Sequence, residues 1–141
     1  MESDTDQHPR TIVERLMVAI NAHDLDGVVA CFADDVESHH PAHPSRSFRG
    51  TDRVRSNWRR ILGGVPDLRA NLVSCVVDGP SAWTEWIWNG TREDGGRFEM
   101  RGVTIQVVRD GAIASVRFFM EPVEVGGAAV SEAVGRVVTG R

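Results

Sequence analysis

Three stretches in the first half of the chain carry apolar residues three or four positions apart, the spacing of an amphipathic helix. The first begins at Thr11, with a glutamate three positions later as in a capping box; the second is capped by Asp24, and the third opens after Gly50. The second should close near Asp34-Asp35, and the third at Gly63-Gly64. The apolar positions are Ile12, Val13, Leu16, Met17 and Ile20, then Leu25, Val28, Val29 and Phe32, then Val54, Trp58, Ile61 and Leu62.

The second half contains four longer runs rich in Val, Ile, Trp and Phe, at residues 68–78, 82–92, 97–108 and 112–123. Asp-Gly turn signals separate them, which is typical of β-hairpins. A shorter strand is predicted at residues 36–40, followed by a proline-containing surface loop up to residue 49. This order predicts an α+β fold in which a cone-shaped, curved antiparallel sheet wraps around three N-terminal helices. The cone leaves an apolar cavity whose mouth suits a small ligand.

The 141-residue length favours one domain. We expect residues 1–10 to be a disordered N-terminus, residues 11–123 to form a single α+β domain, and residues 124–141 to form a C-terminal tail. Helical spacing in the tail is weak, because glycines interrupt the series Val130, Val134 and Val138. The tail could fray, cover the pocket mouth or contribute to a dimer.

Charge and composition narrow the function classes. A net charge of −4 argues against a nucleic-acid partner. The N-terminal segment lacks the apolar run of a secretory signal or membrane span, so we expect a cytoplasmic protein with Cys31 and Cys75 as core thiols. All 16 basic residues are arginines and there is no tyrosine, which excludes lysine and phenol chemistry. Histidines, carboxyls, thiols and hydroxyls remain for acid, base or nucleophile roles.

Short motifs spread over residues 11–123 resemble the nuclear transport factor 2-like superfamily, and within it the ketosteroid isomerases and the SnoaL-like polyketide cyclases. The motifs are Ala22-His23-Asp24-Leu25-Asp26-Gly27, Cys31-Phe32-Ala33-Asp34-Asp35-Val36, Arg49-Gly50-Thr51-Asp52, Trp86 with Asn89-Gly90-Thr91, and Arg109-Asp110-Gly111-Ala112-Ile113. The resemblance implies the fold predicted above. It does not imply one reaction, because the superfamily includes isomerases, cyclases, epoxide hydrolases, dehydratases and non-catalytic binding domains.

At the positions that correspond to the family's catalytic residues, this chain has a possible base but none of the acids. The isomerase's general-base position falls on His40, while its oxyanion-hole tyrosine falls on Leu16 and its oxyanion-hole aspartic acid near Thr104. The cyclase's acid/base aspartate falls on Phe118. Steroid double-bond isomerisation by the family mechanism is therefore not expected.

The epoxide hydrolases' Asp-Arg-Asp group would fall on Phe118, Trp86 and Trp88, so none of its members is present. A register shift of one residue would exchange the two faces of the sheet. Glu85, Arg117 and Glu121 would then face the pocket.

In the predicted register, His40 is the candidate catalytic residue, because imidazole titrates near neutral pH and can accept a proton or activate water. The predicted substrate-binding residues are Leu16, Val36, Trp58, Trp86, Trp88, Met100, Thr104, Gln106, Val116, Phe118 and Met120. Such a cavity suits a flat, mostly apolar ligand with one or two oxygens. No metal or cofactor is expected, because the adjacent His39 and His40 point to opposite faces of a strand.

Two functions follow from these residues. The first is a SnoaL-like small-molecule enzyme of isomerase, cyclase or hydrolase type, acting on a polyketide, terpenoid or steroid-like compound. In it His40 is the base, and Thr104 and Gln106 polarise a substrate oxygen. The alternative is a non-catalytic ligand-binding or dimerisation domain of the same fold. In both we expect a homodimer through the outer sheet face, where Glu85 and Arg117 could pair.

Overall fold

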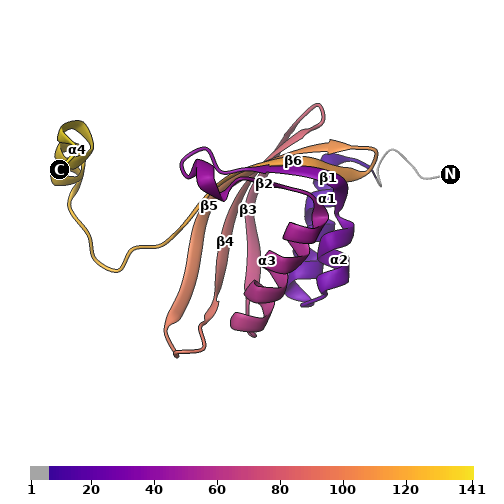
Figure 1. Cartoon of the computed structure of the whole chain (residues 1–141), viewed down its shortest axis with the longest axis horizontal. Coiled ribbons are helices and arrows are strands. Elements are labelled where there is room, and N and C mark those ends of the chain that lie inside the picture. The colour runs from indigo at the N-terminus through magenta and orange to yellow at the C-terminus, as the bar shows by residue number, and fades with distance from the viewer. Residues whose placement is uncertain (1–6) are drawn as a thin grey trace.

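The computed structural model describes residues 7–141, and six strands in it form one mixed sheet in the order β2-β1-β6-β5-β4-β3 (Figure 1). The strands are β1 Phe32–His39, β2 Phe48–Arg49, β3 Arg69–Asp78, β4 Ser81–Thr91, β5 Arg97–Arg109 and β6 Ala112–Pro122. Strands β3 to β6 form the predicted antiparallel meander. The prediction of a wholly antiparallel sheet is wrong at one pair, because β1 runs parallel to β6.

Three helices, α1 Pro9–Asn21, α2 Leu25–Ala30 and α3 Thr51–Gly64, lie together on one side of the sheet (Figure 1). Their buried faces carry the predicted apolar positions, including Ile12, Leu16, Val28 and Trp58. These side chains pack against the inward faces of β3 to β6 and form the core. The predicted α+β architecture, a curved sheet with three N-terminal helices, is confirmed.

Helix α1 begins earlier than predicted. Pro9 occupies its first turn and His8 is the N-cap, whose Nδ1 accepts a hydrogen bond of 3.2 Å from the backbone N–H of Arg10. Thr11 therefore lies inside the helix rather than at its start. Proline suits the first turn because its ring fixes φ and no helical hydrogen bond needs its missing N–H. Residues 1–6 of the predicted disordered N-terminus lie outside the described part of the chain, and the prediction is wrong for Pro9 and Arg10, which belong to α1.

Helix α2 ends sooner than predicted, at Ala30. The carbonyl of Cys31 accepts a hydrogen bond of 2.8 Å from the N–H of Ile113, which draws the chain into the sheet beside β6. Phe32 and the Asp34-Asp35 pair therefore belong to β1 and not to a helix end. Pairing with a distant strand overrides the local helical spacing here.

The predicted surface loop at residues 41–49 contains two short elements, the 3-10 turn η1 Pro44–Arg46 and strand β2. Strand β2 pairs with β1, with Ser38 opposite Phe48. The segment thus contributes β2 as the edge strand of the sheet beside β1, rather than an unstructured loop.

A glycine in β5 lets the sheet bend where it encloses the core. Gly102 has φ 147°, and a Cβ atom there would lie 2.2 Å from the carbonyl oxygen of Phe119. It faces Trp86 on β4 and Met120 on β6. Any other residue would force β5 and β6 apart at this point.

The tail ends in helix α4, Val130–Thr139, which stands apart from the sheet and helices (Figure 1). None of its residues is buried, and Val130, Val134, Val137 and Val138 are exposed. The weak helical spacing predicted for the tail therefore does form a helix. No helix in residues 7–141 has the length and apolarity needed to cross a membrane.

Candidate functional site

A pocket of about 170 Å³ lies between the inward face of the sheet and helices α1 and α3. Most of the residues predicted from the sequence line it, namely His40, Leu16, Val36, Trp58, Trp86, Trp88, Thr104, Gln106, Val116 and Phe118. Met100 and Met120 do not line it. Both lie on the inward face, but Met120 is 2% exposed and Met100 packs against the core, because that face extends beyond the pocket.

The pocket also contains residues that the sequence interpretation did not assign to the site: Ile20, Phe32, Ser38, Phe48, Val54, Asn57, Ile61 and Ile113. Phe32 and Phe48 were missed because their segments were interpreted as helix and loop. Asn57 could have been found, since it lies on the same helical face as Val54 and Ile61. Ser38 shares the inward face of β1 with Val36.

The register of the sheet matches the prediction. Glu85, Arg117 and Glu121 are exposed on the outer face and do not line the pocket. Arg117 lies over the ring of Trp83, with its guanidinium carbon 5.7 Å from the ring centroid. The expected pairing of Arg117 with Glu85 is replaced by this cation–π contact, because Trp83 and Arg117 both lie opposite Ile105.

Four buried polar side chains on β4 and β5 form a closed hydrogen-bond network in the pocket wall. The Gln106 amide donates to the Ala82 carbonyl at 3.0 Å and to Thr84 Oγ1 at 3.1 Å. The Thr84 hydroxyl donates to the Thr104 carbonyl at 2.7 Å, and the Thr104 hydroxyl donates to Gln106 Oε1. Trp86 Nε1 donates to the Thr84 and Thr104 hydroxyls at 2.9 and 3.0 Å.

Every hydrogen of this network has an acceptor inside the protein. Thr104 and Gln106 line the pocket, but neither has a free hydrogen for a ligand oxygen. Polarisation of a substrate oxygen by either residue would first require the network to break. The four side chains thus form a rigid part of the pocket wall in which every donor is already hydrogen-bonded.

His40 follows directly after β1, and its backbone is fixed on both sides. Its N–H donates to Ser47 Oγ at 3.0 Å, and its carbonyl accepts from the N–H of His43 at 2.9 Å. Its ring lies against Phe118, with centroids 4.8 Å apart. The imidazole nitrogens make no hydrogen bond within residues 7–141. The ring is held in place while both nitrogens stay available.

The surroundings of His40 favour its neutral form. Burial lowers the pKa of His40 below its ordinary value of 6.5, and the charges of Arg46 and His43 lower it further. Glu121 opposes this shift, but its carboxylate is paired with His43 Nε2 at 2.6 Å. At neutral pH the imidazole is therefore a free base facing an apolar cavity.

The neighbouring His39 points the other way. It is half-exposed on the outer face, with Nε2 3.6 Å from Glu37 Oε2. The two adjacent histidines therefore do not converge on one point. In residues 7–141, no group of three or more His, Cys, Asp or Glu side chains could hold a metal ion.

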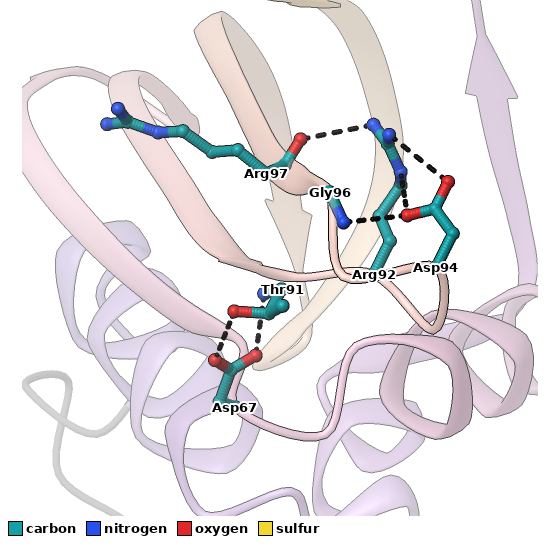
Figure 2. Close-up of polar contacts among 6 residues, drawn as sticks. All are labelled: Asp67, Thr91, Arg92, Asp94, Gly96 and Arg97. Atoms are coloured by element: carbon teal, nitrogen blue, oxygen red, sulfur yellow. Dashed lines mark hydrogen bonds and ion pairs between the residues drawn. The ribbon is translucent and has the colours of Figure 1, made fainter.

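Two carboxylates with lowered pKa values lie outside the pocket, around the β4–β5 hairpin (Figure 2). The pKa of Asp67 is lowered first by the backbone N–H of Thr91 at 2.7 Å and then by its hydroxyl at 2.9 Å. The pKa of Asp94 is lowered by the N–H of Gly96 and then by Arg92. These contacts fix turns and supply no acid or base to the pocket.

Comparison with known proteins identifies the family. The model of the SnoaL-like domain matches residues 13–116. IdmH from Streptomyces antibioticus, described as a candidate polyketide cyclase, superposes with a TM-score of 0.69 at 23% identity over 80% of this chain and 91% of that one. An epoxide hydrolase of M. tuberculosis superposes with a TM-score of 0.69 at 24% identity, over 83% and 84%. A Catenulispora acidiphila protein with a ketosteroid isomerase-like fold superposes with a TM-score of 0.67 at 15% identity, over 77% and 84%.

Proposed function

Because the chain belongs to the SnoaL-like domain family, we propose that it is a cofactor-independent enzyme in which His40 moves a proton within an apolar pocket. One observation carries the proposal. Among the described residues that line the pocket, His40 has the only titratable side chain. Its ring nitrogens are unpartnered, and its lowered pKa keeps the ring unprotonated, and so able to accept a proton, at neutral pH.

The reaction would be either abstraction of a proton from a carbon acid or activation of water. In both, imidazole takes the proton and becomes imidazolium. Its pocket neighbour Phe118 supplies apolar contact but no charge, so the proton should pass back to product or to solvent. This matches an isomerase or cyclase step in the first case, and a hydrolase step in the second.

The pocket wall supports a hydrophobic substrate with one or two oxygens, such as a polyketide, terpenoid or steroid-like compound. Trp58 and Trp88 meet edge to face, with centroids 5.3 Å apart, and Trp88 lies 6.1 Å from Phe118. Flat ring systems bind well to such aromatic surfaces. Ser38 and Asn57 add two uncharged polar groups to the lining.

The alternative, a ligand-binding domain without chemistry, is supported by a specific absence. No carboxylate is found among the described residues that line the pocket. Leu16 and Phe118 occupy positions where the resemblance to the isomerases and cyclases would place a phenol and a carboxyl.

The test compares wild type with His40→Gln and His39→Gln. Exchange of the α-protons of 2-tetralone in D2O, followed by proton NMR, measures carbon-acid chemistry, and diol formation from styrene oxide measures water activation. We expect His40→Gln to lose about a hundredfold or more in one of these rates. His39→Gln is the matched control, because it changes the adjacent, outward-facing histidine. Binding without turnover in wild type, or equal rates in His40→Gln, would favour the binding domain.

We also propose a cytoplasmic homodimer. The outer face of the sheet exposes Val76, Trp83 and Phe119 from three different strands, an apolar surface suited to a second copy.

The free thiols Cys31 and Cys75 are consistent with a reducing compartment such as the proposed cytoplasm.

A further inference from the structure

The polar groups of the pocket divide into two sets. Thr104, Gln106 and Trp86 belong to the closed network and have no hydrogen to offer. The remaining donors of the lining are Ser38, Asn57, the one ring N–H of neutral His40, and the indole N–H of Trp88. The first two are not sealed from water, whereas Trp88 Nε1 is a buried donor with no partner.

Trp88 contrasts with its neighbour on the same strand face. Trp86 is 2% exposed and its N–H is shared by two threonine hydroxyls, whereas Trp88 is 7% exposed and its N–H reaches no acceptor. Among all buried side-chain polar atoms in residues 7–141, Trp88 Nε1 alone is unsatisfied. Buried indole N–H groups normally have a partner, and an unmade hydrogen bond weakens the folded state.

We infer that the Trp88 indole N–H is the hydrogen-bond donor for an acceptor oxygen of the ligand, a carbonyl or ether oxygen on a flat apolar ring system. This inference rests on the proposed function, and it identifies which oxygen-bearing class of ligand the same pocket takes. The rings of Trp58 and Phe118 lie beside the Trp88 ring, so we expect a ligand stacked on either of them to bring its oxygen close to the indole edge.

The arrangement also places this oxygen relative to the base. The ring centroid of Phe118 lies 6.1 Å from that of Trp88 and 4.8 Å from that of His40. The Phe118 ring therefore lies between the donor and the base along the pocket wall. A bicyclic ketone spanning Phe118 would present its oxygen to Trp88 and a carbon near its carbonyl to His40. Trp88 would then stabilise negative charge that develops on oxygen as His40 removes the α-proton.

The indole N–H of Trp88 is buried, and the rings of Trp58 and Phe118 lie beside the Trp88 ring. We expect ligand entry to shift one of these two rings enough to admit an oxygen atom. The hydrogen bond to the ligand would then replace no bond between Trp88 Nε1 and water. Removing this N–H should therefore lower the affinity for an oxygen-bearing ligand.

The experiment uses two probes of nearly equal shape, 2-tetralone and tetralin, which differ by one carbonyl oxygen. In a ¹⁵N–¹H spectrum of the full chain, the Trp88 indole signal is assigned as the one lost in Trp88→Phe. We expect 2-tetralone to move the Trp88 indole proton signal downfield. Tetralin, which has no oxygen, should not cause this downfield shift. The Trp86 signal should respond alike to both probes, because its N–H is already bonded to the threonine hydroxyls and is not free for the carbonyl oxygen.

Affinity gives the second readout. Trp88→Phe keeps an aromatic ring but removes the N–H, and should weaken 2-tetralone binding about tenfold more than tetralin binding. Trp58→Phe is the matched control, since it removes the same indole volume from the same wall and should weaken both probes alike. If Trp88→Phe folds poorly, the Trp88 signal is assigned instead as the one that remains after the signals lost in Trp58→Phe, Trp83→Phe and Trp86→Phe are identified, and the wild-type spectrum still decides the question.

Each outcome is decisive. A Trp88 signal that responds equally to the two probes, or an equal loss of both affinities in Trp88→Phe, overturns the inference and leaves the His40 proposal standing. Failure of wild type to bind either probe overturns the proposed function, and this inference with it. Binding of 2-tetralone with the Trp88 shift but without proton exchange supports the Trp88 donor and contradicts only the catalytic role of His40.

Discussion

Replacement of Thr84 by valine tests the closed network in the pocket wall. Thr84 is 0% exposed, and valine has nearly the same shape without the hydroxyl. The change removes the acceptor for one Gln106 N–H, at 3.1 Å, and the donor to the Thr104 carbonyl, at 2.7 Å. Trp86 keeps its other acceptor, Thr104 Oγ1, at 3.0 Å.

The magnitude follows from these contacts. One buried N–H is left unsatisfied and one carbonyl loses a partner, so we expect the free energy of unfolding to fall by about 1–3 kcal/mol. For a chain of this length, that corresponds to a decrease in Tm of about 3–10 °C. Urea unfolding followed by tryptophan fluorescence and circular dichroism gives the free energy by linear extrapolation.

The matched control is Thr91→Val on the same strand. Its hydroxyl donates to Asp67 Oδ2 at 2.9 Å at an exposed site, where water can replace the lost bond. We expect a smaller loss of stability than for Thr84→Val. Equal and small effects in both variants would refute the closed network, and with it the argument that Thr104 and Gln106 have no hydrogen for a ligand.

Three further predictions concern other parts of the chain. Burial raises the pKa of Cys31 to about 11, so native Cys31 should react with iodoacetamide at pH 8 far more slowly than in urea; rapid native labelling would contradict this. The lowered pKa of Asp67 stabilises the folded state above the ordinary value of 3.8, and this stability is lost as pH falls through the folded-state pKa. Asp67→Asn should therefore be less stable than wild type at pH 7, and the difference should shrink as pH falls through the folded-state pKa of Asp67, as measured by urea unfolding. A difference that does not change with pH would count against the Thr91 contacts as the cause. Trp83→Glu on the outer sheet face should convert the proposed dimer to a monomer in light scattering, and a monomeric wild type would rule that interface out.

The sequence predicted the site well where local periodicity decides which way a side chain points. Alternation along β4 places Trp86 and Trp88 inward, and helical spacing places Trp58 on the inner face of α3. The Asp-Gly turns fix the order of the four long strands, so their register could be predicted without the structure.

Long-range pairing was beyond the sequence. Phe32 follows a helical pattern, but a parallel strand far along the chain draws it into β1 and so into the pocket. The state of the polar groups was equally hidden. Thr104 appears available when read alone, and only the structure shows that its hydroxyl hydrogen is already donated to Gln106 Oε1.

The most direct test of the account is the pH dependence of 2-tetralone proton exchange, measured beside an NMR titration of the His40 ring. Since protonation removes the base, the rate should rise with pH and level off above the pKa of His40. We predict an inflection below 6.5 that coincides with the His40 titration and disappears in His40→Gln. An inflection that persists in His40→Gln, or a rate in wild type that does not follow the His40 titration, would contradict His40 as the base.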